Sequence, residues 1–148
     1  MVIISGNILS KNKFSLISDI EDLNKEKFII FDVLFWKKNK LLLKKSKKSL
    51  GIKLNMENCT EFDFKESKNF NLIQIDFLTF KDGRPFTIAK KLKKNFNYKK
   101  EIRATGYVLP DQYIFLLRSG FDSVEIKQSQ KKTWLSIYKN NLGLYYQK

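Results

Sequence analysis

The sequence predicts an α/β fold, in which a single domain over residues 1–148 holds a mostly parallel sheet built from βαβ units with flanking helices. Three apolar strand patterns between residues 72 and 126 alternate with two helical patterns, and short connections of this kind imply parallel strands joined by right-handed crossovers. The length of 148 residues suits one domain with a real core. A hydrophobic content of 43% is typical of a folded chain.

The first half of the chain gives weaker patterns. Val2–Ile4 predicts a short strand, and residues 11–26 look irregular. Residues 28–35 are almost continuously apolar, which fits a strand or a helix. We favour a helix from about Asp32 into the lysine-rich segment 37–48, which would bury Phe31, Leu34, Phe35, Leu41 and Leu42. A strand is expected at 51–55, followed by a short helix at 59–68 with Thr60 as a possible N-cap.

The motif-bearing half, residues 72–126, has clearer boundaries. Strands are expected at 72–77, 101–105 and 121–126, adjacent and parallel, with one helix from about Thr87 between the first two. Pro110 suits the first turn of a second helix, and Gly120 suits its C-cap. A C-terminal helix over 130–146 would carry one apolar face, which docks on its own domain or forms a homodimer contact; this face holds Trp134, Ile137, Tyr138 and Tyr145.

Composition directs attention to the same half. Every alanine, proline and arginine of the chain lies between Arg84 and Arg118, whereas Lys, Ile, Leu, Phe, Asn and Ser dominate elsewhere. Proline fixes the backbone, and arginine offers a bidentate fork that lysine cannot reproduce. Residues 76–126 are therefore where functional side chains are expected.

An open parallel sheet binds ligands beyond the carboxyl ends of its strands. Two arginines would converge there, and the helix starts near Thr87 and Pro110 would add free N–H groups, so an anion site for sulfate, phosphate or carboxylate is expected. The candidate anion- or partner-binding residues are Asp76, Asp82, Gly83, Arg84, Thr87, Arg103, Gly106, Asp111 and Gln112.

A purely structural role explains the same residues equally well. Asp82 and Gly83 would form a tight turn, Arg84 would pair with Asp76 or Asp82, and Arg103 would pair with Asp111. Thr87 suits an N-cap, and Gly106 suits an ordinary loop glycine.

Several classes of protein are disfavoured. The chain has no histidine, one cysteine and no glycine-rich nucleotide motif, so neither a cofactor nor a metal is expected. The longest apolar run, 29–36, is too short to span a membrane and contains Asp32. The first residues lack the features of a signal peptide, and the single Cys59 suits a reducing compartment, so we expect a cytoplasmic protein in which Cys59 has no catalytic part.

The net charge of +14 raises the possibility of nucleic-acid binding. Nearly all basic residues are lysines spread from Lys11 to Lys148, and only segment 37–48 is dense, with seven lysines. A solvated helix face is the favoured interpretation of this segment, and contact with a nucleic acid or an anionic membrane is the alternative.

Three segments carry a resemblance to a known family: 75–87, 103–112 and 118–122. The stretch 51–126 is similar to domain-of-unknown-function family 934, small bacterial proteins labelled as probable oxidoreductases involved in sulfite reduction because their genes neighbour those for sulfite reductase and phosphoadenylylsulfate reductase. The resemblance implies motif positions at Asp82, Gly83, Arg84, Arg103, Gly106, Asp111, Gln112, Gly120, Phe121 and Asp122.

This chain departs from the family pattern at three positions. Leu78 stands where the family usually has Pro, Pro85 where it has Gly, and Ser119 where it often has Cys. The last departure disfavours a thiol mechanism. The resemblance implies an accessory protein of assimilatory sulfate or sulfite reduction, which binds an anion or one of the two reductases, or assists electron transfer to sulfite as a subunit. A basic nucleic-acid-binding protein is the alternative function.

Overall fold

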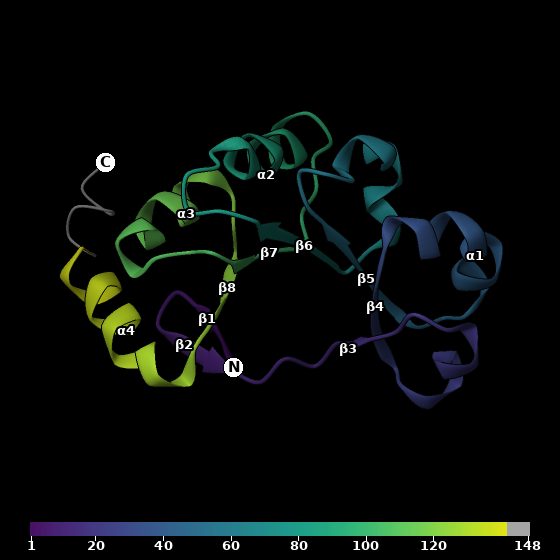
Figure 1. Cartoon of the computed structure of the whole chain (residues 1–148), viewed down its shortest axis with the longest axis horizontal. Helices are drawn as coiled ribbons and strands as arrows, with labels where there is room; N and C mark the ends of the chain where they lie inside the picture. The colour runs from purple at the N-terminus through teal and green to yellow at the C-terminus, as the bar shows by residue number, and fades with distance from the viewer. Residues whose placement is uncertain (142–148) are drawn as a thin grey trace.

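The structure of the protein is a computed structural model that describes residues 1–141. Its centre is an eight-stranded sheet in the order β2-β1-β8-β7-β6-β5-β4-β3. In Figure 1, helices α1, α2 and α3 lie on the upper side of the sheet, and the extended chain between β2 and β3 runs along its lower side. The strands are β1 (Val2–Ser5), β2 (Ile8–Ser10), β3 (Ser15–Leu16), β4 (Phe28–Asp32), β5 (Ser49–Leu54), β6 (Leu72–Phe77), β7 (Glu101–Gly106) and β8 (Ser123–Ile126).

Helices and short 3-10 turns connect these strands. The α-helices are α1 (Val33–Lys45), α2 (Arg84–Lys94), α3 (Tyr113–Ser119) and α4 (Lys131–Asn140). The 3-10 turns are η1 (Ile20–Lys25), η2 (Cys59–Glu61), η3 (Phe64–Asn69), η4 (Pro110–Gln112) and η5 (Gln128–Gln130). Among the described helices, none is long and apolar enough to cross a membrane.

The α/β class is confirmed, but the sheet is mixed rather than mostly parallel. Strands β3 to β8 pair in parallel, including the predicted β6–β7–β8 neighbours. Strand β1 pairs antiparallel with both β2 and β8. The pairing of β1 with β2 has a local reason: the two-residue turn at Gly6 and Asn7 closes a hairpin, and a hairpin can only be antiparallel. The pairing of β1 with β8 joins segments far apart in the sequence.

The ambiguous segment 28–35 contains both a strand and a helix. Strand β4 ends at Asp32, whose carboxylate caps α1 by accepting a hydrogen bond from the Phe35 N–H at 2.9 Å. The prediction that Leu34, Leu41 and Leu42 are buried is wrong, since they are 63%, 75% and 49% exposed. A helix that begins at Val33 instead buries Val33, Phe35, Trp36 and Leu43, and non-helical backbone at Asn39 shifts its phase.

Other predicted boundaries also shift. Segment 59–68 forms the turns η2 and η3 rather than one helix, and Thr60 is not an N-cap. Helix α2 begins at Arg84, so Thr87 lies inside it. The irregular stretch 11–26 contains β3 and η1. Gly120 is the C-cap of α3, as predicted, with a left-handed φ of 113°.

The C-terminal helix docks on its own chain over the described residues. Trp134 of α4 is 1% exposed and packs edge-on against Tyr113 of α3, with ring centroids 5.2 Å apart. The face predicted to dock or dimerise is therefore used within the chain at Trp134. The predicted extension of this helix to residue 146, including Tyr145, lies outside the described residues.

The two faces of the sheet differ in chemistry. Phe77 faces α2, where its ring lies 5.2 Å from that of Phe86. Alternation along a strand then places Asp76 and Gln74 on the opposite face. On that face the extended segment 11–14 crosses the strands, and its Asn12 accepts a hydrogen bond from Arg103 at 2.9 Å. We call this second surface the strap face.

Candidate functional site

The carboxyl ends of β6 and β7 are joined by a close backbone contact. Gly106 has a φ of 86°, and a Cβ atom there would lie 2.5 Å from the carbonyl oxygen of Phe77. The next residue, Tyr107, donates its backbone N–H to the same oxygen at 2.9 Å. Glycine is therefore needed at position 106 so that the two loops can approach closely. The geometry favours this structural role for Gly106 over a role in binding.

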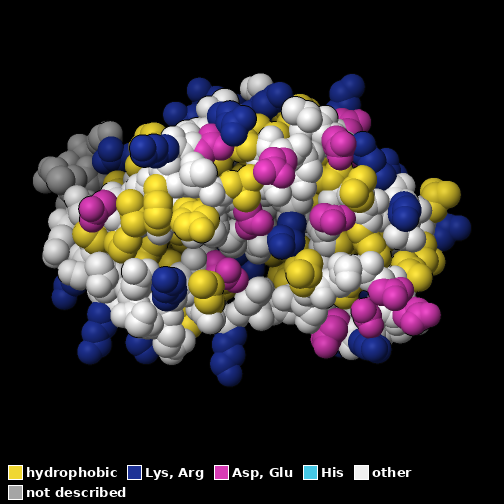
Figure 2. Space-filling view, viewed as in Figure 1, with side chains coloured by type: hydrophobic (Ala, Val, Ile, Leu, Met, Phe, Trp, Pro, Cys, Tyr) yellow, Lys and Arg dark blue, Asp and Glu magenta, His cyan; other side chains and the backbone are white. Residues whose placement is uncertain are grey.

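Large apolar side chains are exposed on these two loops. The rings of Phe80 and Tyr107 meet edge-on with centroids 5.1 Å apart, although the residues are 49% and 54% exposed. Leu78 and Leu109 beside them are also exposed. On the face of the molecule drawn in Figure 2, hydrophobic side chains gather where α3 and β8 lie in Figure 1. We call Leu78, Phe80, Tyr107 and Leu109 the loop patch.

Part of the loop patch borders a cavity. This cavity, of about 330 Å³, is lined by Phe80, Tyr107 and Leu109 from the loops and by Trp134 of α4. The indole N–H of Trp134 is buried and has no hydrogen-bond partner among the described residues. Aromatic walls of this kind suit an apolar group of a ligand or of a partner protein.

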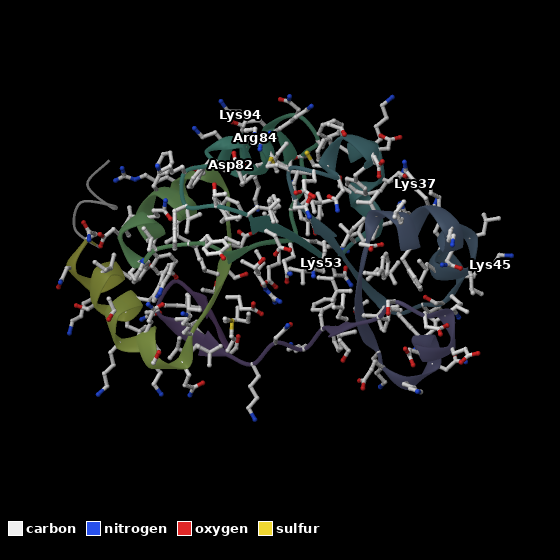
Figure 3. All side chains as sticks on the ribbon, in the orientation of Figure 1. Lys37, Lys45, Lys53, Asp82, Arg84 and Lys94 are labelled. Carbon is white, nitrogen blue, oxygen red and sulfur yellow. The ribbon has the colours of Figure 1, made fainter. Side chains whose placement is uncertain are left out.

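Arg84 and Asp82 form a two-point ion pair at the start of α2. Nε of Arg84 donates to Oδ1 of Asp82 at 2.9 Å, and Nη2 donates to Oδ2 at 2.8 Å. The backbone N–H of Arg84 also donates to Oδ1, at 3.0 Å. These hydrogen bonds lower the pKa of the Asp82 carboxyl group below its ordinary value. Figure 3 shows both residues near the start of α2.

This pair is one of the two Arg84 pairings expected from the sequence for a purely structural role, the other being Arg84 with Asp76. The Arg84 side chain is 71% exposed, so most of its surface still faces solvent. Gly83 between the two residues has a φ of −88°, and nothing lies within 4 Å of a Cβ added there. The turn therefore makes no demand for glycine at Gly83.

Three other predicted site residues, Thr87, Asp111 and Gln112, lie near the carboxyl ends of β6 and β7. The Gln112 side chain accepts a hydrogen bond from the Leu109 N–H at 3.0 Å and so caps η4. Asp111 and Thr87 are exposed, and Thr87 lies one turn into α2. The structure places these residues on the same edge but builds no common site from them.

Arg103 is not beside Arg84. It lies in the interior of β7 on the strap face, is 4% exposed, and donates to Oε2 of Glu101 at 3.1 Å as well as to Asn12. The expected convergence of the two arginines is therefore absent, and Glu101 takes the place of Asp111 as the ion-pair partner. The physical reason is strand alternation, which turns Arg103 away from the side on which α2 begins.

Asp76 lies on the strap face near the carboxyl end of β6. It accepts a hydrogen bond from the Thr105 hydroxyl group of β7. Burial raises the pKa of Asp76 above its ordinary value, and the negative charge of Glu125 adds to this, whereas Lys53 and a hydrogen bond from Gln74 act against it. A cavity of about 360 Å³ runs along these side chains.

Cys59 belongs to neither loop in sequence, although its thiol is near enough to Arg84 to act on that guanidinium electrostatically. It is buried at the start of η2, with 7% exposure, and is a free thiol. Within residues 1–141, no three His, Cys, Asp or Glu side chains lie together as a metal site requires. The described part of the chain therefore offers no group of ligands that would hold a metal ion.

Sequence reasoning missed the polar lining of the strap face. Lys53 and Gln74 were not predicted to be site residues, although each interrupts a largely apolar strand. Period-two alternation in Leu72–Phe77 would have put Gln74 and Asp76 on one face, and this signal was available. The contribution of Lys53 was not, because the neighbours of β5 depend on the order of strands in the sheet.

Comparison with known proteins identifies the family. A sequence model described as "Bacterial protein of unknown function (DUF934)" matches residues 51–148, which is well over half of the chain. The match includes both loops of the carboxyl edge and extends beyond β8 through α4. No curated protein and no solved structure matches the chain. The chain belongs to this family of bacterial proteins of unknown function.

Proposed function

We propose that this protein is an accessory protein of assimilatory sulfate and sulfite reduction in the cytoplasm, and that it binds a partner reductase through its carboxyl edge. The pathway rests on the family, whose genes typically neighbour those for sulfite reductase and phosphoadenylylsulfate reductase. The binding surface consists of the loop patch together with Asp82, Gly83 and Arg84. The proposal assigns no reaction to the chain.

The observation that carries this proposal is the exposure of the loop patch beside Arg84. Phe80 and Tyr107 meet edge-on at the surface instead of packing into the core. Binding energy at protein interfaces is concentrated in aromatic and arginine side chains, and clustered exposed apolar residues are typical of such surfaces. Both loops belong to the segment that matches the family.

The geometry favours a protein partner over a free anion. Two donors of the Arg84 guanidinium are already bound to the Asp82 carboxylate, and the pair carries no net charge. A site for free sulfate needs an excess of positive charge or several converging donors, and Arg103 does not contribute any. The free donors of Arg84 can still bond to an oxygen atom on a protein surface that the loop patch holds in place.

Affinity capture from the native host tests the proposal. The immobilised protein is expected to retain sulfite reductase or phosphoadenylylsulfate reductase from a lysate of cells grown on sulfate. The double variant Phe80→Ser/Tyr107→Ser should lose that reductase, because it removes the exposed aromatic pair and changes no buried residue. Leu41→Ser is a matched control, since Leu41 is 75% exposed on the distant helix α1.

Two results would contradict the proposal. Capture of neither reductase by the wild-type protein would refute the partner assignment. Equal capture by the double variant would refute the position of the surface. Binding of sulfate at millimolar concentration, abolished by Arg84→Lys, would instead favour the anion-binding version.

A nucleic-acid-binding protein is the alternative function. Its supporting observation is that α1 and the residues after it expose Lys37, Lys38, Lys44, Lys45 and Lys47. Binding through these side chains should fall steeply as salt concentration rises, because each neutralised phosphate releases a counterion. Retention of a nucleic acid that Lys37→Ser/Lys45→Ser abolishes and Phe80→Ser/Tyr107→Ser does not would favour this alternative.

A further inference from the structure

The strap face contains a second cavity, which shares Leu78 and Tyr107 with the loop patch but has charged residues of its own. Its volume is about 360 Å³, and it lies along the carboxyl ends of β5, β6, β7 and β8. Its charged lining is Lys53, Asp76 and Glu125, its neutral polar lining is Gln74 and Thr105, and its apolar lining includes Leu78 and Tyr107. A concave, partly apolar site with a few converging polar groups is the usual form of a small-molecule site.

Sheet register brings the two carboxylates to the two sides of one residue. Asp76 pairs with Thr105, and the pairing of Ala104 with Val124 puts Thr105 level with Glu125. The backbones that carry Asp76 and Glu125 are thus two strand spacings apart, about 10 Å. Thr105 lies between them and donates a hydrogen bond to Asp76, and all three residues line the cavity.

The third charge has the opposite sign and lies on the other side of Asp76. Lys53 of β5 pairs with Gln74 of β6, which precedes Asp76 by two residues and therefore lies on the same face of the sheet. Figure 3 shows Lys53 at the centre of the view, and Figure 2 shows acidic side chains around a basic one there. The cavity therefore carries two negative charges and one positive charge, in a chain whose net charge is +14.

These charges are not neutralised by direct contact. Among residues 1–141, neither Lys53 nor Glu125 takes part in an ion pair, and the direct partners of Asp76 are the uncharged Thr105 and Gln74. Gln74 and Thr105 are 9% and 3% exposed, so they hold Asp76 from within the sheet. Charges that line a cavity and form no direct ion pair with one another are candidates for binding a charged ligand.

We propose that this cavity binds a zwitterionic small molecule with a protonated amine, a carboxylate and an apolar body. The amine lies between Asp76 and Glu125, where it donates to both carboxylates. The carboxylate of the ligand pairs with Lys53. The apolar body packs against Tyr107 and Leu78.

Three probes of the same shape separate the contributions of the two charges. L-phenylalanine carries both groups, phenethylamine carries only the amine, and 3-phenylpropionate carries only the carboxylate. Titration into the isotopically labelled protein, followed by amide NMR shifts, is expected to show binding in the order L-phenylalanine, phenethylamine, 3-phenylpropionate. The shifts should concentrate at Thr105, Gly106 and Tyr107.

Variants assign each charge to its side chain. Asp76→Asn and Glu125→Gln should each weaken both amine-bearing probes about tenfold or more, which is the loss expected for one hydrogen bond to a charged group. Lys53→Met should weaken L-phenylalanine and should not weaken phenethylamine, because the amine probe has no carboxylate for Lys53 to pair with and is repelled by its charge. Asp111→Asn is the control, because Asp111 is an exposed carboxylate that does not line the cavity.

The proposal is overturned if no probe binds, if 3-phenylpropionate binds best, or if Glu125→Gln binds as the wild type does. Glu125 is only half-buried, so its variant keeps the test valid even where Asp76→Asn unfolds. The assay uses the protein alone. Failure to capture a reductase therefore leaves this inference intact, and failure here leaves the reductase surface intact.

Discussion

Substitution of Gly106 by alanine tests whether the two loops of the carboxyl edge are held by a close backbone contact. Gly106 has a φ of 86°, in the left-handed region that alanine rarely adopts. The added Cβ atom would lie 2.5 Å from the Phe77 carbonyl oxygen and 3.2 Å from the Phe77 nitrogen. Both are backbone atoms, so no side chain can rotate to make room.

The expected loss of stability follows from two contributions. Holding alanine in left-handed backbone costs about 1–2 kcal/mol. Moving the Phe77 backbone out of the way strains or breaks the hydrogen bond from the Tyr107 N–H, for about 1 kcal/mol more. The sum is about 2–3 kcal/mol, which for a chain of this size lowers the melting temperature by roughly 4–12 °C.

Gly83→Ala is the matched control on the same edge. Its φ of −88° is open to any residue, and nothing lies within 4 Å of the added Cβ. We expect its free energy of unfolding to stay within about 0.5 kcal/mol of the wild type. Urea denaturation followed by circular dichroism measures both variants. A Gly106→Ala protein as stable as Gly83→Ala would refute the close contact.

Three further predictions concern single side chains. Arg84→Lys keeps the charge but loses the two hydrogen bonds to Asp82, so it should weaken reductase capture and leave the melting temperature nearly unchanged. A large fall in melting temperature with intact capture would make Arg84 purely structural. Because burial raises the pKa of Asp76, the folded wild type loses stability as the pH rises through that raised pKa. Asp76→Asn should therefore gain stability relative to the wild type between pH 3 and pH 7 in denaturation curves. A stability difference that stays constant with pH would contradict this. Cys59→Ser should leave sulfate-dependent growth unchanged, because the thiol is buried and has no second cysteine to react with. A growth defect at normal protein abundance would contradict this.

The second half of the fold could be predicted from sequence because its signals are local. Leu72–Phe77 is a compact apolar run, and Gly120 ends α3 with the left-handed backbone that glycine favours. Lysine-rich α1 was harder, because three leucines that fit a helical stripe are exposed and the kink at Asn39 has no clear sequence signal. The antiparallel docking of β1 on β8 is a contact between the two ends of the described chain, and no local pattern encodes it.

The sequence correctly indicated the loops of the candidate site, but it did not indicate the partners of Arg103. Asp82 and Arg84 could be foreseen as partners because they are two residues apart in a turn. Arg103 could not be placed correctly without knowing which face of β7 the helices cover, and its partners Glu101 and Asn12 depend on that choice. The strap-face cavity combines side chains from four strands, so it follows only from the order of the sheet.

Hydrogen–deuterium exchange of the protein alone and mixed with the host's sulfite reductase or phosphoadenylylsulfate reductase tests the proposed function most directly. The proposal predicts that one of the two enzymes slows exchange in peptides that cover 78–84 and 107–109. Peptides from the lysine-rich segment 37–48 should exchange at the same rate with and without the enzyme. Unchanged exchange at both loops with both reductases, or protection confined to segment 37–48, would contradict the proposal.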